Sequence, residues 1–253
     1  MKPGSSKDKI IRDRIDNILV KKGLAKSRDR AKALILAGVV MVNETKVDKA
    51  GTRIDENSSI RLLKNDHEYV SRGALKILGA MDHFNIDVRN KIVMDAGAST
   101  GGFTEVMLKR GASKVFAVDV GYGILDWKLK SDPRVISLER TNARDVGADK
   151  IKEPIDFISM DLSFISLKKV IPNLVQFLKG SGALLALIKP QFEVGKKEVE
   201  RGGLVKDISK HKRVISEIEK LCESNSLHVV GTVESKVKGL KGNQEYFIYC
   251  IKT

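Results

Sequence analysis

Residues 91–120 read KIVMDAGASTGGFTEVMLKRGASKVFAVDV, and this stretch decides the fold. An apolar run at 92–96 leads into a glycine-rich turn and then into a helical pattern at 104–109, and a second apolar run follows at 115–120. A strand, a tight turn, a helix and another strand form a βαβ unit with parallel strands. The glycine-rich turn then lies at the carboxyl end of the first strand, where sheets of this kind bind ligands.

The same alternation continues along the chain. A helix is predicted at 72–84 and another at 210–223, and the predicted strands are 92–96, 115–120, 135–138, 155–160, 184–188, 227–235 and 245–251. Short apolar runs that alternate with helical patterns indicate a doubly wound, mostly parallel sheet. We therefore predict an α/β fold with a Rossmann-like sheet of seven strands that ends in a hairpin.

Residues 1–66 have a different pattern and are predicted to form a separate α+β domain. A first helix ends at Gly23, a second helix runs from a Ser27 cap to Gly38, and short strands lie on either side of a turn at 43–44 and near 60–63. Residues 67–71 are polar and lack periodicity, so they are assigned to a linker. The larger domain is then 72–253.

The charge balance favours a polyanionic partner. The 253 residues contain 46 Lys and Arg against 32 Asp and Glu, a formal net charge of +14. Residues 1–66 hold 16 Lys and Arg against 9 Asp and Glu, a net of +7, so about a quarter of the chain carries half of the charge. Concentration in one short domain indicates phosphate contacts. The competing interpretation is charge that only keeps the protein soluble.

Composition also limits the compartment. Residues 1–14 are polar, and no window approaches eighteen consecutive apolar residues, so neither a signal peptide nor membrane insertion is expected. Cys222 and Cys250 lie far from any His-rich cluster, so we expect no metal site and no disulfide framework. The predicted location is the cytoplasm.

The glycine-rich turn, Asp95-Ala-Gly-Ala-Ser-Thr-Gly-Gly-Phe103, is a candidate cofactor site. Its glycines do not match G-x-G-x-x-G, which disfavours pyrophosphate and hence a dinucleotide-dependent dehydrogenase. Asp95 suits a cationic amino-acid cofactor, and Asp119 can accept hydrogen bonds from ribose hydroxyls. The loop at 139–145 is placed at the edge of an adenine pocket. The predicted cofactor-binding residues are Asp95, Gly97, Ala98, Ser99, Thr100, Gly101, Gly102, Phe103, Asp119, Val120, Asn142, Ala143 and Asp161.

Two further strand ends carry charge. Asp161 follows the run at 155–160, and Lys189 follows the apolar run at 184–188. A lysine beside a buried strand is costly unless it is paired or functional, although a solvated lysine at a strand exit is the simpler alternative.

Four local motifs match one family closely. They are Ser71-Arg-Gly-Ala-Leu-Lys76, Met160-Asp161-Leu-Ser-Phe164, Ile188-Lys189-Pro-Gln-Phe-Glu193 and Lys241-Gly-Asn-Gln-Glu245. The chain resembles the TlyA family of ribosomal RNA ribose methyltransferases, whose catalytic domain is similar to FtsJ. The resemblance implies S-adenosylmethionine as cofactor and a catalytic tetrad of Lys76, Asp161, Lys189 and Glu245. It further implies a ribose 2′-hydroxyl, of a cytidine in small-subunit rRNA, as methyl acceptor, with large-subunit rRNA as a second candidate.

The resemblance extends to the N-terminal domain, which is similar to the RNA-binding domain first seen in ribosomal small-subunit protein four. Its pattern is Arg14-Ile-Asp16, Ser27-Arg28, Gly38-Val-Val40 and Val42-Asn43. Ribosomal RNA or ribosomal subunits, and not DNA, are the implied partners. The RNA-binding residues are predicted to be Arg14, Ser27, Arg28, Arg30, Lys32 and Arg72. Residues 67–70 lack the Arg and Trp of some relatives, so linker-based coupling of RNA and cofactor binding is left open.

Three questions stay open on sequence alone. Lys76 would lower the pKa of Lys189 whereas Asp161 and Glu245 would raise it, so the protonation state of Lys189 is undecided. A non-catalytic ribosome-assembly factor and a membrane-acting haemolysin are the alternative functions. The polar segment 193–207 is a candidate lid beside the site.

Overall fold

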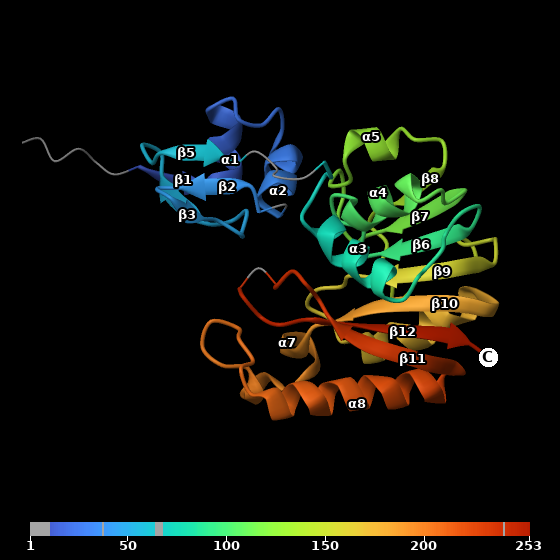
Figure 1. Cartoon of the computed structure of the whole chain (residues 1–253). Coiled ribbons are helices and arrows are strands. Elements are labelled where there is room, and N and C mark those ends of the chain that lie inside the picture. Colours follow the sequence, from blue (N-terminus) through green and yellow to red (C-terminus); the bar gives the residue numbers. More distant parts are fainter. Residues whose placement is uncertain (1–10, 37, 64–67, 240) are drawn as a thin grey trace, which may run out of the picture. The chain divides into compact units, whose positions relative to one another are not determined.

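The computed structural model describes residues 11–36, 38–63, 68–239 and 241–253 (Figure 1). The chain divides into two compact units, an N-terminal unit (1–66) and a C-terminal unit (67–253). Within these described ranges, no helix is long and apolar enough to cross a membrane.

The N-terminal unit is a small α+β structure with one apolar core. Its elements are β1 (Arg12–Arg14), α1 (Ile15–Lys21), α2 (Arg28–Leu36), β2 (Val40–Val42), β3 (Thr45–Lys46), β4 (Arg53–Asp55) and β5 (Ile60–Leu62). Strands β3, β2 and β5 form an antiparallel sheet in that order, and β1 pairs with β4. Ile15 and Leu19 of α1 and Ala31 and Ile35 of α2 are fully buried against this framework.

Local signals in this unit are confirmed, and one strand pair was missed. The Ser27 hydroxyl accepts a hydrogen bond from the Arg30 N–H at 3.1 Å, as an N-cap does, and Gly23 has φ +70° after α1. Asn43 and Glu44, with φ 45° and 61°, make the tight turn between β2 and β3. Strands β1 and β4 were not expected, because each is three residues long and mostly charged, so neither shows an apolar period.

The C-terminal unit has the predicted α/β fold. Its elements are α3 (Gly73–His83), β6 (Ile92–Ala96), α4 (Gly102–Lys109), β7 (Lys114–Val118), α5 (Trp127–Lys130), β8 (Val135–Leu138), β9 (Ile155–Met160), η1 (Leu167–Lys169), α6 (Ile171–Leu174), η2 (Val175–Phe177), β10 (Leu178–Ile188), α7 (Pro190–Glu193), η3 (Lys196–Glu198), α8 (Ile208–Ser224), β11 (Leu227–Glu234) and β12 (Tyr246–Lys252). Seven strands form one sheet in the order β11-β12-β10-β9-β6-β7-β8, in which β12 pairs antiparallel with both β10 and β11 and the other pairs are parallel (Figure 1).

Both faces of this sheet are buried. Along β10, Leu184, Ala186 and Ile188 belong to one core cluster, whereas Leu185 and Leu187 belong to the other. This alternation follows from the two-residue period of a strand. Helices α3 and α4 supply the second cluster, and α6 and α8 supply the first, so helices cover the two faces of the sheet.

Some boundaries differ from expectation. Strand β10 starts at Leu178, six residues before the predicted start, because the backbone continues through the irregular Gly- and Ser-containing segment 179–182. Strand β7 ends at Val118, so Asp119 lies beyond the strand.

Of the predicted linker 67–71, His67 lies outside the described residues. Val70 donates its N–H to Glu105 at 2.7 Å and the Lys109 ammonium lies 4.1 Å from the Tyr69 ring centre, so 68–71 packs on α4.

Candidate active site

The carboxyl ends of the parallel strands meet at one edge of the sheet. Asp161 directly follows β9, and Lys189 directly follows the neighbouring β10. Strand β12 is antiparallel to β10, so its first residues lie at the same edge, and the register pairs Ile188 with Tyr246. Glu245, which precedes Tyr246, is thereby brought next to Lys189, although 56 positions separate them in the sequence.

Lys189 makes two close contacts at this edge. Its Nζ lies 2.6 Å from Asp161 Oδ1 in an ion pair and donates a hydrogen bond to Ser163 Oγ at 2.9 Å. The Lys189 side chain is 8% exposed. The lysine at the strand exit is therefore buried and paired, which excludes the simple alternative of a solvated lysine.

Lys76, from α3, pairs with Glu245 instead. Its Nζ donates to Glu245 Oε2 at 2.7 Å, and the Glu245 side chain is 3% exposed. Burial lowers the pKa of Lys76, but the carboxylates of Asp161 and Glu245 outweigh it, so the net shift is upward. Burial raises the pKa of Asp161, and the charges of Lys189 and Lys76 outweigh it, so that pKa is lowered. The four predicted residues thus form two ion pairs that are electrostatically linked.

Two polar residues of this cluster were missed by the sequence analysis. Ser163 holds Lys189, as described, and Gln191 donates its Nε2 to Glu245 Oε1 at 3.2 Å. Each stands two positions after a predicted catalytic residue, at a strand exit where polar side chains collect. That spacing was the available signal, and only the hydrogen bonds assign a partner to either side chain.

Two glycines permit close backbone packing around the cluster. Gly97 has φ +87°, and a Cβ added there would lie 2.5 Å from the Asp161 carbonyl oxygen. A Cβ on Gly239 would lie 2.6 Å from Glu245 Oε1. The glycine-rich turn and the loop before β12 therefore approach the acidic residues more closely than any side chain would allow.

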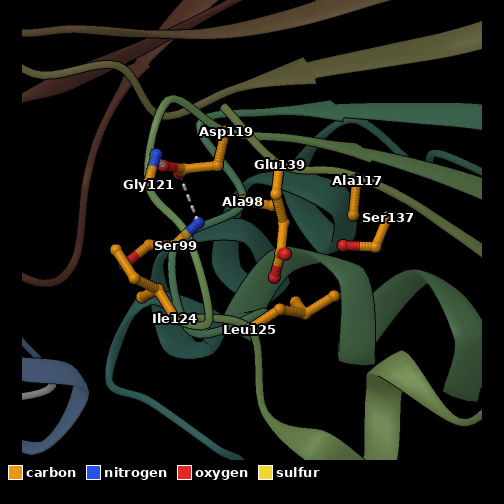
Figure 2. A pocket seen from close by; sticks show the side chains of 9 residues that line it. All are labelled: Ala98, Ser99, Ala117, Asp119, Gly121, Ile124, Leu125, Ser137 and Glu139. Carbon is orange, nitrogen blue, oxygen red and sulfur yellow. Dashed lines mark hydrogen bonds between the residues drawn. The ribbon is translucent and has the colours of Figure 1, made fainter. Parts of the chain in front are cut away.

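A pocket lies beside the glycine-rich turn, at the ends of β6, β7 and β8 (Figure 2). Asp119 joins two backbone segments that line the pocket. One carboxylate oxygen of Asp119 accepts the Ser99 N–H at 2.8 Å, and the other accepts the Gly121 N–H at 2.7 Å. The pocket is lined by Ala98, Ser99, Ala117, Asp119, Gly121, Ile124, Leu125, Ser137 and Glu139. It has apolar walls and a few oriented polar groups, which is the usual composition of a small-molecule site.

The pocket includes some of the predicted cofactor-binding residues. Ala98, Ser99 and Asp119 line it, whereas Val120 is 68% exposed and Ala143 belongs to the core cluster. The Asn142 side chain accepts the Arg144 N–H at 3.0 Å within its own loop. Gly121, Ile124, Leu125 and Ser137 were not predicted, because nothing in their residue types distinguishes a pocket wall from ordinary core or turn positions.

Asp95 lies beneath the turn, fully buried. Its carboxylate accepts a 2.6 Å hydrogen bond from the Thr104 hydroxyl and a 3.4 Å hydrogen bond from the Ser159 hydroxyl. Burial, together with the negative charges of Asp161 and Asp119, raises the pKa of Asp95 to about 7, although the Thr104 hydrogen bond opposes the shift. A neighbouring positive charge would relieve the cost of ionising this side chain.

In the N-terminal unit, one buried carboxylate holds two of the predicted RNA-binding arginines. Asp16 is fully buried. Arg14 donates to both Asp16 oxygens, from Nε at 3.0 Å and from Nη2 at 2.9 Å, and Arg28 Nη2 donates to the second oxygen at 3.3 Å. The two arginine side chains are 43% and 56% exposed. Asp16 therefore orients two guanidinium groups whose remaining N–H donors can reach an anion.

The other predicted RNA-binding residues have different surroundings. Ser27 caps α2 as described, and Lys32 pairs with Asp29 at 2.9 Å. Arg30 is exposed on α2. Arg72 belongs to the C-terminal unit, where it precedes α3 and its charge acts to lower the pKa of Lys76.

The candidate lid, 193–207, is anchored at several points. Glu193 accepts hydrogen bonds from Ser166 Oγ at 2.5 Å and from the Leu167 N–H at 2.8 Å. At the other end, the Asn243 side chain accepts the Val205 N–H at 3.0 Å and donates to the Gly203 carbonyl at 2.8 Å. The segment is thus tied to the loop that precedes Glu245.

Comparison with known proteins assigns the family. The model of the FtsJ-like methyltransferase family matches residues 69–252, and that of the S4 domain matches residues 13–60. TlyA of Mycobacterium tuberculosis, named a 16S/23S rRNA (cytidine-2′-O)-methyltransferase, is 44% identical over 94% of this chain and 89% of its own. Hemolysin A of Brachyspira hyodysenteriae is 40% identical over 94% and 99%.

A solved structure agrees with these sequence relatives. A Streptococcus thermophilus protein, grouped by its description with the hemolysins, has a TM-score of 0.73 and 39% identity, and the match covers 97% of this chain and 90% of that one. The relatives match over both units, and the predicted tetrad and glycine-rich turn lie within the matched residues 69–252. The chain therefore belongs to the FtsJ-like methyltransferase family, in a group that carries an S4 domain ahead of the catalytic unit.

Proposed function

We propose that this protein transfers the methyl group of S-adenosylmethionine to a ribose 2′-hydroxyl of ribosomal RNA. The observation that carries the proposal is the buried Lys189, held by Asp161 and Ser163 at the sheet edge that also contains the pocket. The named activity of the Mycobacterium tuberculosis relative, at 44% identity over nearly the whole chain, supports the same reaction class.

The pocket suits the nucleoside part of this cofactor. A carboxylate can accept about four hydrogen bonds. The Asp119 oxygens accept one backbone N–H each, from Ser99 and Gly121, so lone pairs remain for two ribose hydroxyls. Ile124 and Leu125 offer an apolar surface to the adenine. When bound, S-adenosylmethionine supplies a sulfonium-activated methyl group, so the protein has only to align the acceptor oxygen and assist loss of its proton.

Asp95 supports a cationic cofactor. Its pKa is raised to about 7 by burial and by the nearby Asp161 and Asp119 carboxylates. A positively charged amino-acid moiety above the turn would favour the ionised form, whereas a pyrophosphate would add a further negative charge. The acidic surroundings of the glycine-rich turn therefore favour the sulfonium cofactor over a dinucleotide.

Lys189 is placed to act on the acceptor hydroxyl. Its nitrogen is tetrahedral, and two of its positions are occupied by contacts to Asp161 and Ser163. A third position remains in either protonation state. In the neutral amine it is a lone pair that takes the hydroxyl proton; in the ammonium ion it is an N–H that stabilises the developing alkoxide while the proton leaves to water.

Lys76 and Glu245 would act as the supporting pair. Lys76 has a raised pKa and stays charged at neutral pH, and it holds the Glu245 carboxyl group through the 2.7 Å contact. Glu245 is 3% exposed and is held on its other oxygen by Gln191. A rigid buried carboxylate beside the reacting lysine can accept a hydrogen bond from the substrate ribose and fix its orientation.

The N-terminal unit and the named activity of a relative both support RNA as the substrate. The S4 match at 13–60 coincides with the Asp16-oriented Arg14 and Arg28, which suit the phosphates of folded RNA. The Mycobacterium tuberculosis relative is named a cytidine-2′-O-methyltransferase of 16S and 23S rRNA, so we propose a cytidine in small-subunit rRNA as the target, with large-subunit rRNA as the second candidate. Mapping of 2′-O-methylation on rRNA from cells with and without the protein identifies the nucleotide.

The variant Lys189→Ala tests the catalytic role. Transfer of radiolabelled methyl groups to purified ribosomal subunits should fall by about 10²- to 10⁴-fold, the usual contribution of a positioned acid or base. S-adenosylmethionine affinity, measured by calorimetry, should change little, because Lys189 does not line the pocket. Lys220→Ala, at an exposed position on α8, is the matched control and should keep full activity. Normal turnover by Lys189→Ala would contradict the assignment.

A further inference from the structure

One short segment of the C-terminal unit presents aromatic rings outward. In 120–127, Val120 is 68% exposed, Tyr122 is 56% exposed and Trp127 is 70% exposed. Trp127 is the single tryptophan of the whole chain. Isolated exposed apolar residues are common, but a tryptophan and a tyrosine that are both exposed within six positions of one segment are candidates for contact with a binding partner.

The same segment forms a wall of the cofactor pocket. Gly121, Ile124 and Leu125 face the pocket, as Figure 2 shows, while Tyr122 and Trp127 are exposed. The segment is also packed against the glycine-rich turn, because a Cβ on Gly101 would lie 2.8 Å from a Leu125 methyl carbon. A ligand on the outer side of this wall would therefore lie close to the cofactor without occupying its pocket.

Cations accompany the rings. The Arg140 guanidinium carbon lies 4.3 Å from the centre of the Tyr122 ring, and the Lys130 ammonium lies 5.9 Å from it. Lys128, Lys130 and Arg140 are all exposed. The acidic neighbours are already engaged: Glu139 accepts from the Gly123 N–H and pairs with Lys130, and Asp126 caps α5. The surface presents exposed aromatic side chains beside positive charge.

We propose that Trp127 and the stacked Tyr122–Arg140 pair form a platform for unpaired bases of the substrate RNA. Bases stack on aromatic rings and on guanidinium planes, and their phosphates match the surrounding cations. An apolar protein face would have to desolvate three cations here, which favours RNA over a protein partner. This inference rests on the proposed RNA substrate and adds a binding surface that is separate from the tetrad and from the N-terminal unit.

Fluorescence of the intact protein gives a direct test, because Trp127 is the only tryptophan. The probes are a 12-nucleotide oligouridylate and an RNA duplex that carries the same number of phosphates. Stacking should quench Trp127 emission with the single strand and protect it from acrylamide, whereas the duplex should do neither. Unchanged emission with a single strand that binds, as measured by filter retention, would overturn the proposal.

Variants separate stacking from folding. Trp127→Ala should weaken binding to protein-free rRNA transcripts by about 5- to 150-fold, the range expected for one stacked base. Trp127→Phe should restore most of that affinity. Ile208→Ala, which truncates another residue that is 59% exposed, is the control and should bind normally. S-adenosylmethionine affinity should be unchanged in all three, which shows that the pocket wall is intact.

The remaining outcomes are also decisive. If Trp127→Ala weakens binding to intact ribosomal subunits but not to protein-free rRNA, the platform contacts a protein and the inference fails. If the wild-type protein methylates rRNA while Trp127→Ala binds RNA normally, the platform fails and the proposed function stands. If the wild-type protein methylates no rRNA at all, the proposed function itself has failed.

Discussion

The buried Asp95 makes folding stability depend on pH in a direction that can be tested with one substitution. Asp95 is fully buried beneath the glycine-rich turn, and its pKa is raised from 3.8 to about 7 by burial and by the charges of Asp161 and Asp119. Asn is nearly isosteric. Its oxygen can accept the Thr104 hydrogen bond, and its amide can donate to Ser159 Oγ, which lies 3.4 Å from Asp95 Oδ1.

The size of the effect follows from linkage. The native state holds the Asp95 proton more tightly than the unfolded chain, so its contribution to stability is complete below pH 4 and is lost as pH rises through 7. A difference of about 3 pKa units corresponds to about 4 kcal/mol. The side chain introduced by Asp95→Asn does not ionise, so this variant does not lose that stability as the pH rises. Its stability advantage over the wild type should therefore grow by about 2–3 kcal/mol between pH 5 and pH 8.

Urea denaturation of the wild type and of Asp95→Asn at pH 5, 6, 7 and 8 measures this difference. Because other ionisable groups are common to both proteins, their contributions cancel. Asp156→Asn is a control of opposite sign: burial raises the pKa of Asp156, but hydrogen bonds from Lys179 and from the Ile92 N–H outweigh it and lower it, so this variant should be less stable at neutral pH. A stability advantage of Asp95→Asn that is constant from pH 5 to pH 8 would refute the reasoning.

Two further substitutions test the close packing at the turn and the arginine pair. Gly97→Ala should weaken both S-adenosylmethionine binding and turnover, because its Cβ would press on the Asp161 carbonyl; Gly242→Ala, with a similar φ of +89° but open space, separates this clash from backbone strain. Asp16→Asn should weaken RNA binding in a filter assay although it makes the protein more positive, since Arg14 and Arg28 lose their common anchor. Equal or tighter binding would show that Asp16 is only a neighbouring negative charge.

Local patterns predicted most of the secondary structure, and they were wrong where local pattern is weak. The glycine-rich turn, the alternating runs and the Ser27 cap were all visible in sequence. Strands β1 and β4 were missed because a three-residue charged strand is defined only by the partner with which it pairs, some 40 positions away. The early start of β10 at Leu178 was missed because its Gly- and Ser-containing segment 179–182 has no apolar period.

The residues of the pocket were also only partly predictable from local sequence patterns. Asp119 was identified because an acidic residue after the second strand has a chemical reason to be there, and it does line the pocket. Ile124 and Leu125 were not identified, since apolar side chains have the same sequence signature in a pocket wall and in a core. Val120 was also predicted as a cofactor residue, from its position after the second strand, and it is 68% exposed in the turn after β7.

The sequence by itself determined which residues stand near the ends of strands. The spacing of apolar residues within an element and the turn residues that end it are both local properties. It could not determine which of those ends meet. Lys76 and Glu245 are 169 positions apart, and they pair at 2.7 Å only because β12 returns antiparallel beside β10. Likewise, Lys189 is buried against Asp161 because β9 and β10 are neighbours. Strand order and burial are properties of the whole chain, and they decide which charges are paired.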